Sequence, residues 1–473
     1  MYFEQFYLGC LAHASYLLGS KTEAVVVDPQ RDVDLYLKAA EDHGLTIRHI
    51  FETHLHADFV SGHKELAART GAQIYFGASA GATFPHVAVQ DGFELRFGKA
   101  RIKVLETPGH TLESICLLVT HDEKPVKLKP WAVLTGDTLF LGDVGRPDLS
   151  RTHTPQELAG LLYDSLHNKL LKLPDEVLVY PAHGAGSLCG RNMRAERSST
   201  IGTERLTNYA LQIQSREEFV NQLTSNLPAR PDYFLQDAEI NRGGAAALSD
   251  MPELKAIAPA QLQVMLENEE EGVIALDIRP GDQFAAGHVP GSINIALSGQ
   301  FATWAGTILG LSSRPVLIAD SLEQIAEARV RLARVGIEAE RGYLQGGVAE
   351  WKQAGFDLAQ LPETTARELH QRLSEQGLSG NTVRVLDVRR EPEWMAGHVA
   401  GAAWWPLDRF RVSPPEVDLS IPLAVHCQSG YRSMIACSLL QRAGFKNVIN
   451  VTGGFAEWQE AQLPVSTGAP VEA

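Results

Sequence analysis

Residues of the types that bind metal ions occur at four points in the N-terminal half of the chain, each just after a short apolar run. Residues at the ends of buried strands lie on loops that a rigid sheet holds in place, so four such groups are expected to converge on one metal ion. A lone His-x-His motif would be weak evidence, because most histidines are surface or core residues. The groups are His54, His56 and Asp58 after Ile47–Phe51, His110 after Ile102–Leu105, Asp137 after Ala132–Leu134, and His183 after Val177–Tyr180.

The composition limits the class of protein. The chain has 473 residues, enough for about three domains, and 44% of them are hydrophobic. A formal net charge of −15 argues against nucleic acid as a partner. Five cysteines over this length indicate free thiols in a reducing compartment. The first residues lack the features of a signal peptide and no apolar run is long enough to cross a bilayer, so we expect a cytoplasmic protein without a membrane partner.

Strand-like and helix-like segments alternate up to about Tyr209, which predicts an α/β domain. The strand Ala24–Val27 and the helical segments Val33–His43 and Ser61–Thr70 are examples. Residues 217–254 are expected to form a helical tail and a linker, because proline and glycine recur there.

The second half of the chain repeats itself. Leu276-Asp277-Ile278-Arg279 recurs as Leu386-Asp387-Val388-Arg389, and further motifs recur at similar spacing. A unit of about a hundred residues used twice indicates a duplicated domain, since its period far exceeds that of solenoid repeats. We therefore predict three domains, at residues 1–250, 255–362 and 363–473.

The first domain resembles the metallo-β-lactamase superfamily, whose His-x-His-x-Asp-His, Gly-His, Gly-Asp and terminal His motifs match the four groups. The resemblance implies an αββα sandwich. One position departs from the pattern, because Phe59 stands where the family has a further histidine. In the two-metal hydrolases that histidine helps Asp58 and His183 to hold the second ion. A phenyl ring cannot bind a metal, so we expect a single ion.

His54, His110 and Asp137 offer two imidazoles and one carboxylate. This facial set leaves positions open on non-haem Fe(II) for substrate and O2, although catalytic zinc accepts the same ligand types. Within the superfamily the persulfide dioxygenases are most similar, and the resemblance implies that these three residues hold one Fe(II) per chain, with Zn as the alternative. Three further residues are expected to orient the ligands and water without binding the ion: His56, Asp58 and His183.

Two more residues are candidates for a substrate pocket. Residues 142–148, which include Arg146, also resemble the persulfide dioxygenases. Cys189 follows His183 in a glycine-containing loop, a position suited to a thiol that handles persulfide sulfur. The alternative for Cys189 is a small buried hydrophobic residue.

Both repeated units resemble rhodanese domains. In the second unit the apolar run Leu423–His426 leads into Cys427 and a small-residue loop before a helix, where backbone N–H groups and the helix N-terminus would stabilise a thiolate. The loop matches the family's Cys-x-x-Gly-x-Arg-Ser pattern, which implies Cys427 as the nucleophile and Arg432 as an anion contact. The cradle for a terminal persulfide sulfur would comprise Gln428, Ser429, Gly430, Tyr431 and Ser433.

The first unit lacks this nucleophile. The offset between the tryptophans, 458 − 351 = 107, places the counterpart of Cys427 at Asp320. A carboxylate repels sulfur anions and cannot carry a sulfane sulfur, so we predict a catalytically silent spacer or interface.

The combined resemblance is to the persulfide dioxygenase/rhodanese fusions. It implies oxidation of a low-molecular-weight thiol persulfide by O2 to sulfite and thiol in sulfide detoxification. Cys427 would pass sulfane sulfur among persulfide, sulfite and thiosulfate. Two alternatives stay open: a zinc-dependent glyoxalase II-like thioester hydrolase with an appended sulfurtransferase, and a non-enzymatic sulfur-binding scaffold. The carrier thiol (glutathione, coenzyme A, bacillithiol or a protein) and the direction of transfer also stay open, and a homo-oligomer is compatible with the sequence.

Overall fold

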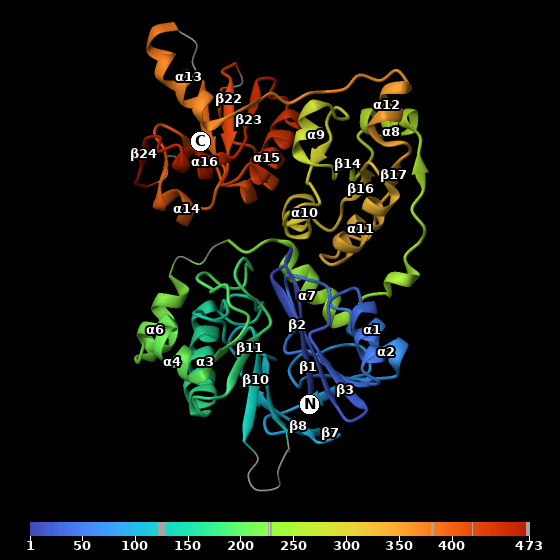
Figure 1. Cartoon of the computed structure of the whole chain (residues 1–473), viewed down its shortest axis with the longest axis vertical. Coiled ribbons are helices and arrows are strands. Elements are labelled where there is room, and N and C mark those ends of the chain that lie inside the picture. Colours follow the sequence, from blue (N-terminus) through green and yellow to red (C-terminus); the bar gives the residue numbers. More distant parts are fainter. Residues whose placement is uncertain (122–128, 226, 228, 380–382, 419, 470–473) are drawn as a thin grey trace. The chain divides into compact units, whose positions relative to one another are not determined.

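The chain forms two compact units, which are described separately (Figure 1). The computed structural model describes residues 1–121, 129–225, 227, 229–379, 383–418 and 420–469. The first unit comprises Met1–Met251 with Ala333–Gly336, and the second comprises Pro252–Leu332 with Ile337–Ala473.

Two six-stranded sheets form the centre of the first unit, with the orders β1-β2-β3-β4-β5-β6 and β12-β11-β10-β9-β8-β7. The strands of the first sheet are β1 (Tyr2–Leu8), β2 (His13–Ser20), β3 (Glu23–Val27), β4 (Thr46–Phe51), β5 (Gln73–Gly77) and β6 (Val87–Val89). Those of the second are β7 (Glu94–Phe97), β8 (Ala100–Glu106), β9 (Ile115–His121), β10 (Pro130–Gly136), β11 (Leu178–Pro181) and β12 (Ser199–Thr200).

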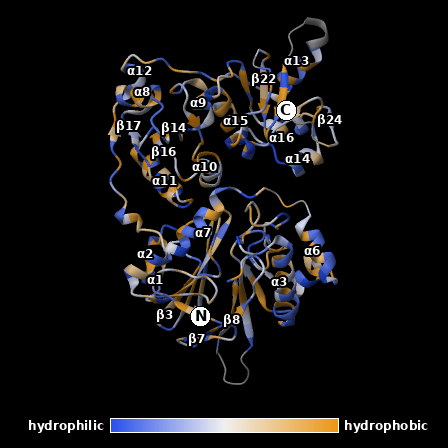
Figure 2. Cartoon of the chain, turned by 180° about the vertical axis from the view of Figure 1, so that it is seen from behind, coloured by the Kyte–Doolittle hydropathy of each residue, from blue (hydrophilic) through white to orange (hydrophobic). Residues whose placement is uncertain are grey.

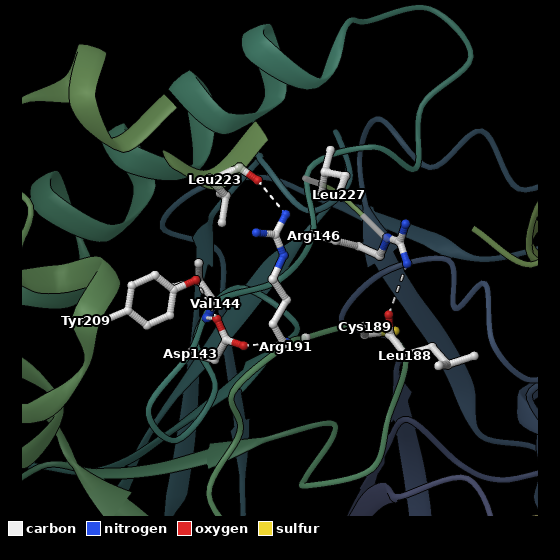
Figure 3. A pocket seen from close by; sticks show the side chains of 10 residues that line it. Asp143, Val144, Arg146, Leu188, Cys189, Arg191, Tyr209, Leu223 and Leu227 are labelled. Atoms are coloured by element: carbon white, nitrogen blue, oxygen red, sulfur yellow. Dashed lines mark hydrogen bonds between the residues drawn. The ribbon is translucent and has the colours of Figure 1, made fainter. Parts of the chain in front are cut away.

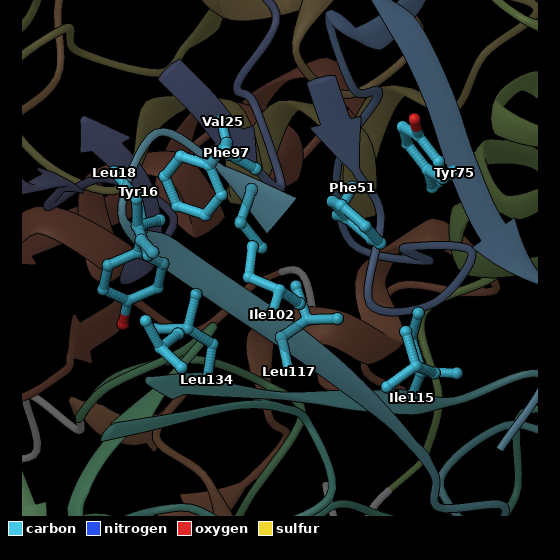
Figure 4. Close-up of a cluster of buried hydrophobic side chains, with 14 of the residues drawn as sticks. Tyr16, Leu18, Val25, Phe51, Tyr75, Phe97, Ile102, Ile115, Leu117 and Leu134 are labelled. Carbon is cyan, nitrogen blue, oxygen red and sulfur yellow. The ribbon is translucent and has the colours of Figure 1, made fainter. Parts of the chain in front are cut away.

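The two sheets pack face to face through a buried apolar core (Figure 4). Successive residues of a strand point to opposite faces of a sheet, and the strands follow this rule. In β3, Val25 and Val27 enter the core between the sheets, while Val26 joins the apolar cluster on the outer face. Both faces of these strands are therefore buried, and Figure 2 shows apolar residues concentrated along them.

Helices cover both outer faces. The first sheet is covered by α1 (Asp34–Asp42) and α2 (His63–Thr70), which contribute residues to its outer cluster. The helices that cover the second sheet, or follow it along the chain, are α3 (Pro155–Asn168), η1 (Leu170–Lys172), α4 (Ile201–Thr207), α5 (Tyr209–Gln212), α6 (Arg216–Thr224), α7 (Tyr233–Gly243) and η2 (Leu248–Asp250). The layers are α, β, β and α, which confirms the predicted sandwich.

The second unit contains two sheets of identical topology, β13-β17-β16-β14-β15 and β18-β23-β22-β19-β21. The strand pairs inside both sheets are parallel. The first sheet has the elements β13 (Ala256–Ile257), α8 (Pro259–Glu267), β14 (Val273–Asp277), α9 (Gly281–Ala286), β15 (Ile293–Asn294), α10 (Phe301–Leu309), β16 (Arg314–Ile318), α11 (Leu322–Ala333), β17 (Gly342–Leu344) and α12 (Gly347–Gln353).

The second sheet repeats this order. Its elements are β18 (Glu363–Thr364), α13 (Ala366–Ser379), β19 (Arg384–Asp387), α14 (Glu391–Ala396), β21 (Ala403–Trp404), η3 (Leu407–Arg411), β22 (Leu423–His426), α15 (Tyr431–Arg442), β23 (Val448–Val451) and α16 (Gly454–Glu460), with β20 (His398–Val399) paired to β24 (Val465–Ser466). The predicted duplication of an α/β domain is therefore present in the fold.

The strand register corrects one prediction. Asp277 pairs with Ile318 in the first sheet, and Asp387 pairs with His426 in the second. The residue after each partner is Ala319 in one copy and Cys427 in the other, so the assignment of Asp320 was wrong by one position. The tryptophan offset failed because the first copy has one more residue between this point and its tryptophan, 351 − 319 = 32 against 458 − 427 = 31. Neither Ala319 nor Asp320 is a thiol, so the absence of a nucleophile stands.

No helix among the residues that the structure describes is long and apolar enough to span a bilayer.

Candidate metal centre and sulfur-transfer loop

Three of the four strand ends in the first unit bring metal-binding atoms together. The Nε2 atoms of His54 and His110 lie 3.8 and 3.4 Å from Oδ2 of Asp137. All three side chains are buried. His110 Nε2 and Asp137 Oδ2 make no hydrogen bond with the described residues. An unpaired buried polar atom costs about 1–3 kcal/mol, so this convergence indicates a ligand shared by the three side chains.

Hydrogen bonds fix the orientation of both imidazoles. His54 Nδ1 lies 3.0 Å from the hydroxyl of Thr53, which itself donates to Asp28 at 2.9 Å and therefore accepts from the imidazole. His110 Nδ1 donates to the carbonyl oxygen of Arg146 at 2.9 Å. With Nδ1 protonated in each ring, the lone pair lies on Nε2, the arrangement of metal-binding histidines. Burial, with neighbouring His56, also holds the pKa of His54 well below its usual value, which keeps the ring neutral.

Asp137 is held by the fourth group. His183 Nδ1 donates to Asp137 Oδ1 at 2.8 Å, and its Nε2 lies 2.8 Å from Oδ2 of Asp58. Burial alone would lower the pKa of His183, but the carboxylates of Asp137 and Asp58 outweigh it and hold that pKa well above its usual value. The imidazolium in turn helps to keep Asp137 ionised, with Oδ2 left over for a metal.

Other predicted residues lie around this set. His56 Nε2 lies 3.1 Å from Asp28 and 3.5 Å from Glu52, and its ring is 4.1 Å from that of His54. Phe59 is fully buried, with its ring 4.4 Å from that of His56. Two further groups of side chains have ligand-type atoms within 4.8 Å of one another: Asp58, His183 and Cys189, and Asp28, Glu52 and His56.

Two further participants, Asp28 and His13, were not predicted from the sequence. Asp28 directly follows the apolar run of β3, so the strand-end rule that selected the four groups would also have selected it. His13 begins β2, and its ring lies 4.0 Å from Phe59 and 5.4 Å from His183. Both of its ring nitrogens are buried without a hydrogen bond to the described residues. No sequence signal marks His13, because the antiparallel bridge that places it beside His183 is non-local.

A small pocket that opens to solvent lies beside Cys189, next to this centre (Figure 3). Arg146 and Cys189, which were expected to line a substrate pocket, both lie in its wall. The Arg146 guanidinium pairs with Asp148 at 2.6 Å and donates to the carbonyl oxygen of Leu188. Burial, with nearby Asp58 and Asp137, raises the pKa of the Cys189 thiol well above its usual value. The remaining lining residues are Asp143, Val144, Leu188, Gly190, Arg191, Tyr209, Leu223 and Leu227.

Close packing beside the centre requires glycine at position 145. An added Cβ on Gly145 would lie 2.8 Å from Nδ1 of His110 and would collide with the carbonyl oxygen of Asp137. This close approach brings the Arg146 carbonyl to the imidazole. The glycine of the 142–148 segment therefore serves the orientation of a candidate ligand.

In the second unit, Cys427 directly follows β22 and its side chain is buried. The Gly430 N–H donates to Cys427 Sγ at 3.2 Å, which provides one of the expected donors. Gly430 has a φ of 98°, a left-handed conformation that favours glycine, and α15 begins at the next residue. The sulfur atom therefore lies at the N-terminal end of a helix, which favours an anion.

The remaining loop residues surround the thiol in different ways. The Arg432 guanidinium makes two hydrogen bonds to Glu393, at 2.7 and 2.6 Å. An anion bound by Arg432 would therefore share the guanidinium with this carboxylate. Ser433 Oγ lies 2.7 Å from Oδ1 of Asn450. Gln428 accepts from Arg389 at 3.4 Å, and Ser429 is exposed.

Comparison with known proteins agrees with this architecture. The metallo-beta-lactamase superfamily matches residues 8–183, and the rhodanese-like domain family matches residues 258–354 and 365–461. Human mitochondrial persulfide dioxygenase ETHE1 is 31% identical over 223 residues, covering 45% of this chain and 77% of ETHE1. The hydroxyacylglutathione hydrolase of Francisella tularensis subsp. novicida (strain U112) is 32% identical over 174 residues, covering 37% of this chain and 63% of the hydrolase.

A solved structure matches most of the chain. The metallo-beta-lactamase from Staphylococcus aureus subsp. aureus COL is 33% identical and covers 73% of this chain and 98% of its own, with a TM-score of 0.64. The chain belongs to the metallo-β-lactamase superfamily. It is a fusion whose N-terminal domain is homologous to the persulfide dioxygenases and is followed by two rhodanese-like domains.

Removal of one candidate ligand should remove the metal. We expect His54→Ala and Asp137→Ala each to weaken binding of a divalent metal at least tenfold, since loss of even an outer hydrogen-bond partner costs about 10- to 100-fold. Elemental analysis after dialysis measures the metal content. His49→Ala is the matched control, because His49 lies on β4, the strand that precedes His54, but bonds to Tyr75. Equal metal in the His54 and His49 variants would contradict the assignment.

The first rhodanese-like domain should stay silent even with a thiol in the corrected position. We expect Ala319→Cys to acquire persulfide at less than about a tenth of the Cys427 level, because an activated cysteine needs an electropositive surrounding. The Asp320 N–H already bonds to the Gln324 side chain at 2.9 Å, and the acidic Glu323 follows in the loop. Mass spectrometry after incubation with thiosulfate makes the comparison. Equal labelling of both thiols would show that loop chemistry does not decide activity.

Proposed function

We propose that this chain is an iron-dependent persulfide dioxygenase fused to a sulfurtransferase. The convergence of His54, His110 and Asp137 carries the proposal for the first activity, because two neutral imidazoles and one carboxylate suit mononuclear Fe(II). The likeness to ETHE1, which is named a persulfide dioxygenase, supports the same assignment. Phe59 favours a single ion, because it removes the histidine that two-metal relatives use.

The proposed reaction is R–S–SH + O2 + H2O → R–SH + SO3²⁻ + 2 H⁺. The outer sulfur of the persulfide is oxidised to sulfite and O2 is reduced, while the S–S bond breaks and the inner sulfur leaves as the thiol. Bound Fe(II) supplies the activation of O2. The residues of the chain would bind the ion and orient its ligands. His183 donates to Oδ1 of Asp137, and the Arg146 carbonyl fixes the ring of His110.

The pocket of Figure 3 is the proposed place for the body of the persulfide. Cys189 lines this pocket, and its sulfur lies within 4.8 Å of ligand-type atoms of Asp58 and His183. A substrate in the pocket would therefore reach the centre from the side of Cys189. The charge of Arg146 in this wall is paired with Asp148, but the Arg191 guanidinium in the same wall donates to the backbone carbonyls of Leu223 and Ser225, and its positive charge suits a persulfide with an anionic body.

The second activity is sulfur transfer at Cys427. The thiolate attacks the outer sulfur of a persulfide, the S–S bond breaks, and the carrier leaves as a thiol. The sulfur of sulfite then attacks the terminal sulfur on Cys427, which releases thiosulfate and restores the thiolate. The Gly430 N–H and the N-terminus of α15 support this proposal, because they stabilise an anionic sulfur at that position.

The metal content should distinguish the dioxygenase from its main rival. We expect about one iron per chain and little zinc after anaerobic purification, because the chain offers one set of two histidines and a carboxylate without the second-site histidine. Elemental analysis and O2 uptake with glutathione persulfide or coenzyme A persulfide measure the two properties. Two zinc ions per chain, with thioester hydrolysis and no O2 uptake, would instead support a hydroxyacylglutathione hydrolase-like enzyme.

The two activities should be separable by one substitution. We expect Cys427→Ser to reduce sulfur transfer from thiosulfate to a thiol by at least about a thousandfold, since a hydroxyl cannot carry a sulfane sulfur. Persulfide-dependent O2 uptake should change less than twofold. Cys437→Ala is the control, because Cys437 is a buried thiol of the same domain that lies inside α15. Retained transfer in the Cys427 variant, or loss of both activities together, would contradict this division of labour.

A further inference from the structure

One face of α15 packs against the first rhodanese-like domain. The contacts recur three or four residues apart, which is the spacing of residues on one face of a helix. They come from Tyr431, Met434, Ser438 and Arg442. The helix that carries the sulfur-transfer loop at its N-terminus is therefore held along its length by the domain that has no thiol.

Two of these contacts are hydrogen bonds near the far end of the helix. The N–H of Asn294 donates to Ser438 Oγ at 3.1 Å, inside a buried region. The Arg442 guanidinium donates to the carbonyl oxygen of Gly291 at 3.0 Å. Both partners in the first rhodanese-like domain are backbone groups. Their positions therefore do not depend on the rotamer of any side chain of that domain.

The contact nearest the thiol is made by Tyr431. Its hydroxyl donates to the carbonyl oxygen of Ala296 at 2.8 Å. The ring lies directly on Gly299, where an added Cβ would be 2.8 Å from Cε2 of Tyr431. A hydrogen bond therefore fixes the end of the side chain, and the ring packs against the bare backbone of Gly299.

The segment that receives Tyr431 is itself anchored. The N–H of Ile295 donates to the carbonyl oxygen of Asp277 at 3.0 Å, and that of Leu297 donates to Ile278 at 3.2 Å. Asp277 ends β14, an inner strand of the first rhodanese-like sheet. The Ala296 carbonyl is thus held by backbone hydrogen bonds to the end of an inner strand of that sheet.

Tyr431 stands between two residues of the proposed sulfur-transfer machinery. Gly430, just before it, donates its N–H to Cys427 Sγ, and Arg432, just after it, pairs with Glu393. Because Tyr431 is joined to both by peptide bonds, a shift of its anchored side chain would turn the donor that faces the sulfur atom. A displacement of such a donor by about 1 Å is enough to weaken its stabilisation of a charged sulfur atom.

We propose that Tyr431 is a positioning residue through which the first rhodanese-like domain sets the sulfur-transfer loop of the second. The silent domain is then needed for sulfur transfer although it carries no nucleophile. This inference rests on the proposed role of Cys427 as the sulfur acceptor.

Full-length Tyr431→Phe tests the hydrogen bond to Ala296. We expect kcat/KM for transfer from thiosulfate to glutathione to fall about 3- to 10-fold, the range for a lost neutral hydrogen bond, with persulfide-dependent O2 uptake unchanged. Tyr343→Phe is the control, because Tyr343 lies on β17 and its hydroxyl makes no side-chain hydrogen bond with the described residues. Formation of persulfide on Cys427, followed by mass spectrometry, should slow by the same factor.

A double-mutant cycle separates positioning from general damage. Gly299→Ala should also reduce transfer about 3- to 10-fold by pushing on the ring, but it should have no effect in a Tyr431→Ala background, where that ring is absent. Gly355→Ala is the matched control. Gly355 lies in the same domain and also has a positive φ, of 88°, yet an added Cβ there would meet no atom within 4 Å.

The outcomes distinguish the inference from the function on which it rests. A wild-type chain that forms no persulfide on Cys427 would overturn the proposed sulfur transfer itself. A wild-type chain that transfers sulfur, with Tyr431→Phe equally active, would overturn only the positioning role. If the losses of sulfur transfer in Gly299→Ala and Tyr431→Ala multiply in the double variant, the positioning role would also be overturned, because the two residues would then act independently.

Discussion

The candidate metal centre depends on hydrogen bonds that occupy the outer atoms of its ligands. Thr53 and the Arg146 carbonyl take the Nδ1 protons of the two imidazoles, and His183 takes one oxygen of Asp137. Each bond removes one alternative orientation or tautomer of a ligand. The atoms left for a metal, Nε2 of His54 and His110 and Oδ2 of Asp137, therefore face one another. Without these partners the same three side chains would be free to bond elsewhere, and a buried set of polar groups would become a liability for stability.

The sandwich fold explains why these partners are available. Side chains that follow strands of both sheets meet at the candidate centre, and loops that follow buried strands are held by the strands themselves. The loops that carry the three candidate ligands can therefore reach the centre from β4, β8 and β10, and the loop that carries His183 from β11, without long unsupported segments. Glycine at position 145 allows a further loop to approach closely enough to bond to an imidazole through its backbone.

The second unit shows one fold used for two purposes. Both copies have the same strand order and parallel pairing, yet only one copy places a thiol after its central strand. The copy without the thiol contacts the face of α15 beside the other copy's loop. These contacts are the basis of the positioning role proposed for Tyr431.

The sequence by itself determined the α/β class, the sandwich, the duplication, and which side chains have the chemistry to bind a metal or carry sulfur. Those features are local: residue types, short spacings, and apolar runs that end at them. Only the tertiary structure decided that Ala319 rather than Asp320 corresponds to Cys427, because strand register depends on pairing between distant segments. It also decided the contacts of His13 and Tyr431, whose partners lie far away in the chain and leave no periodic signal in the sequence.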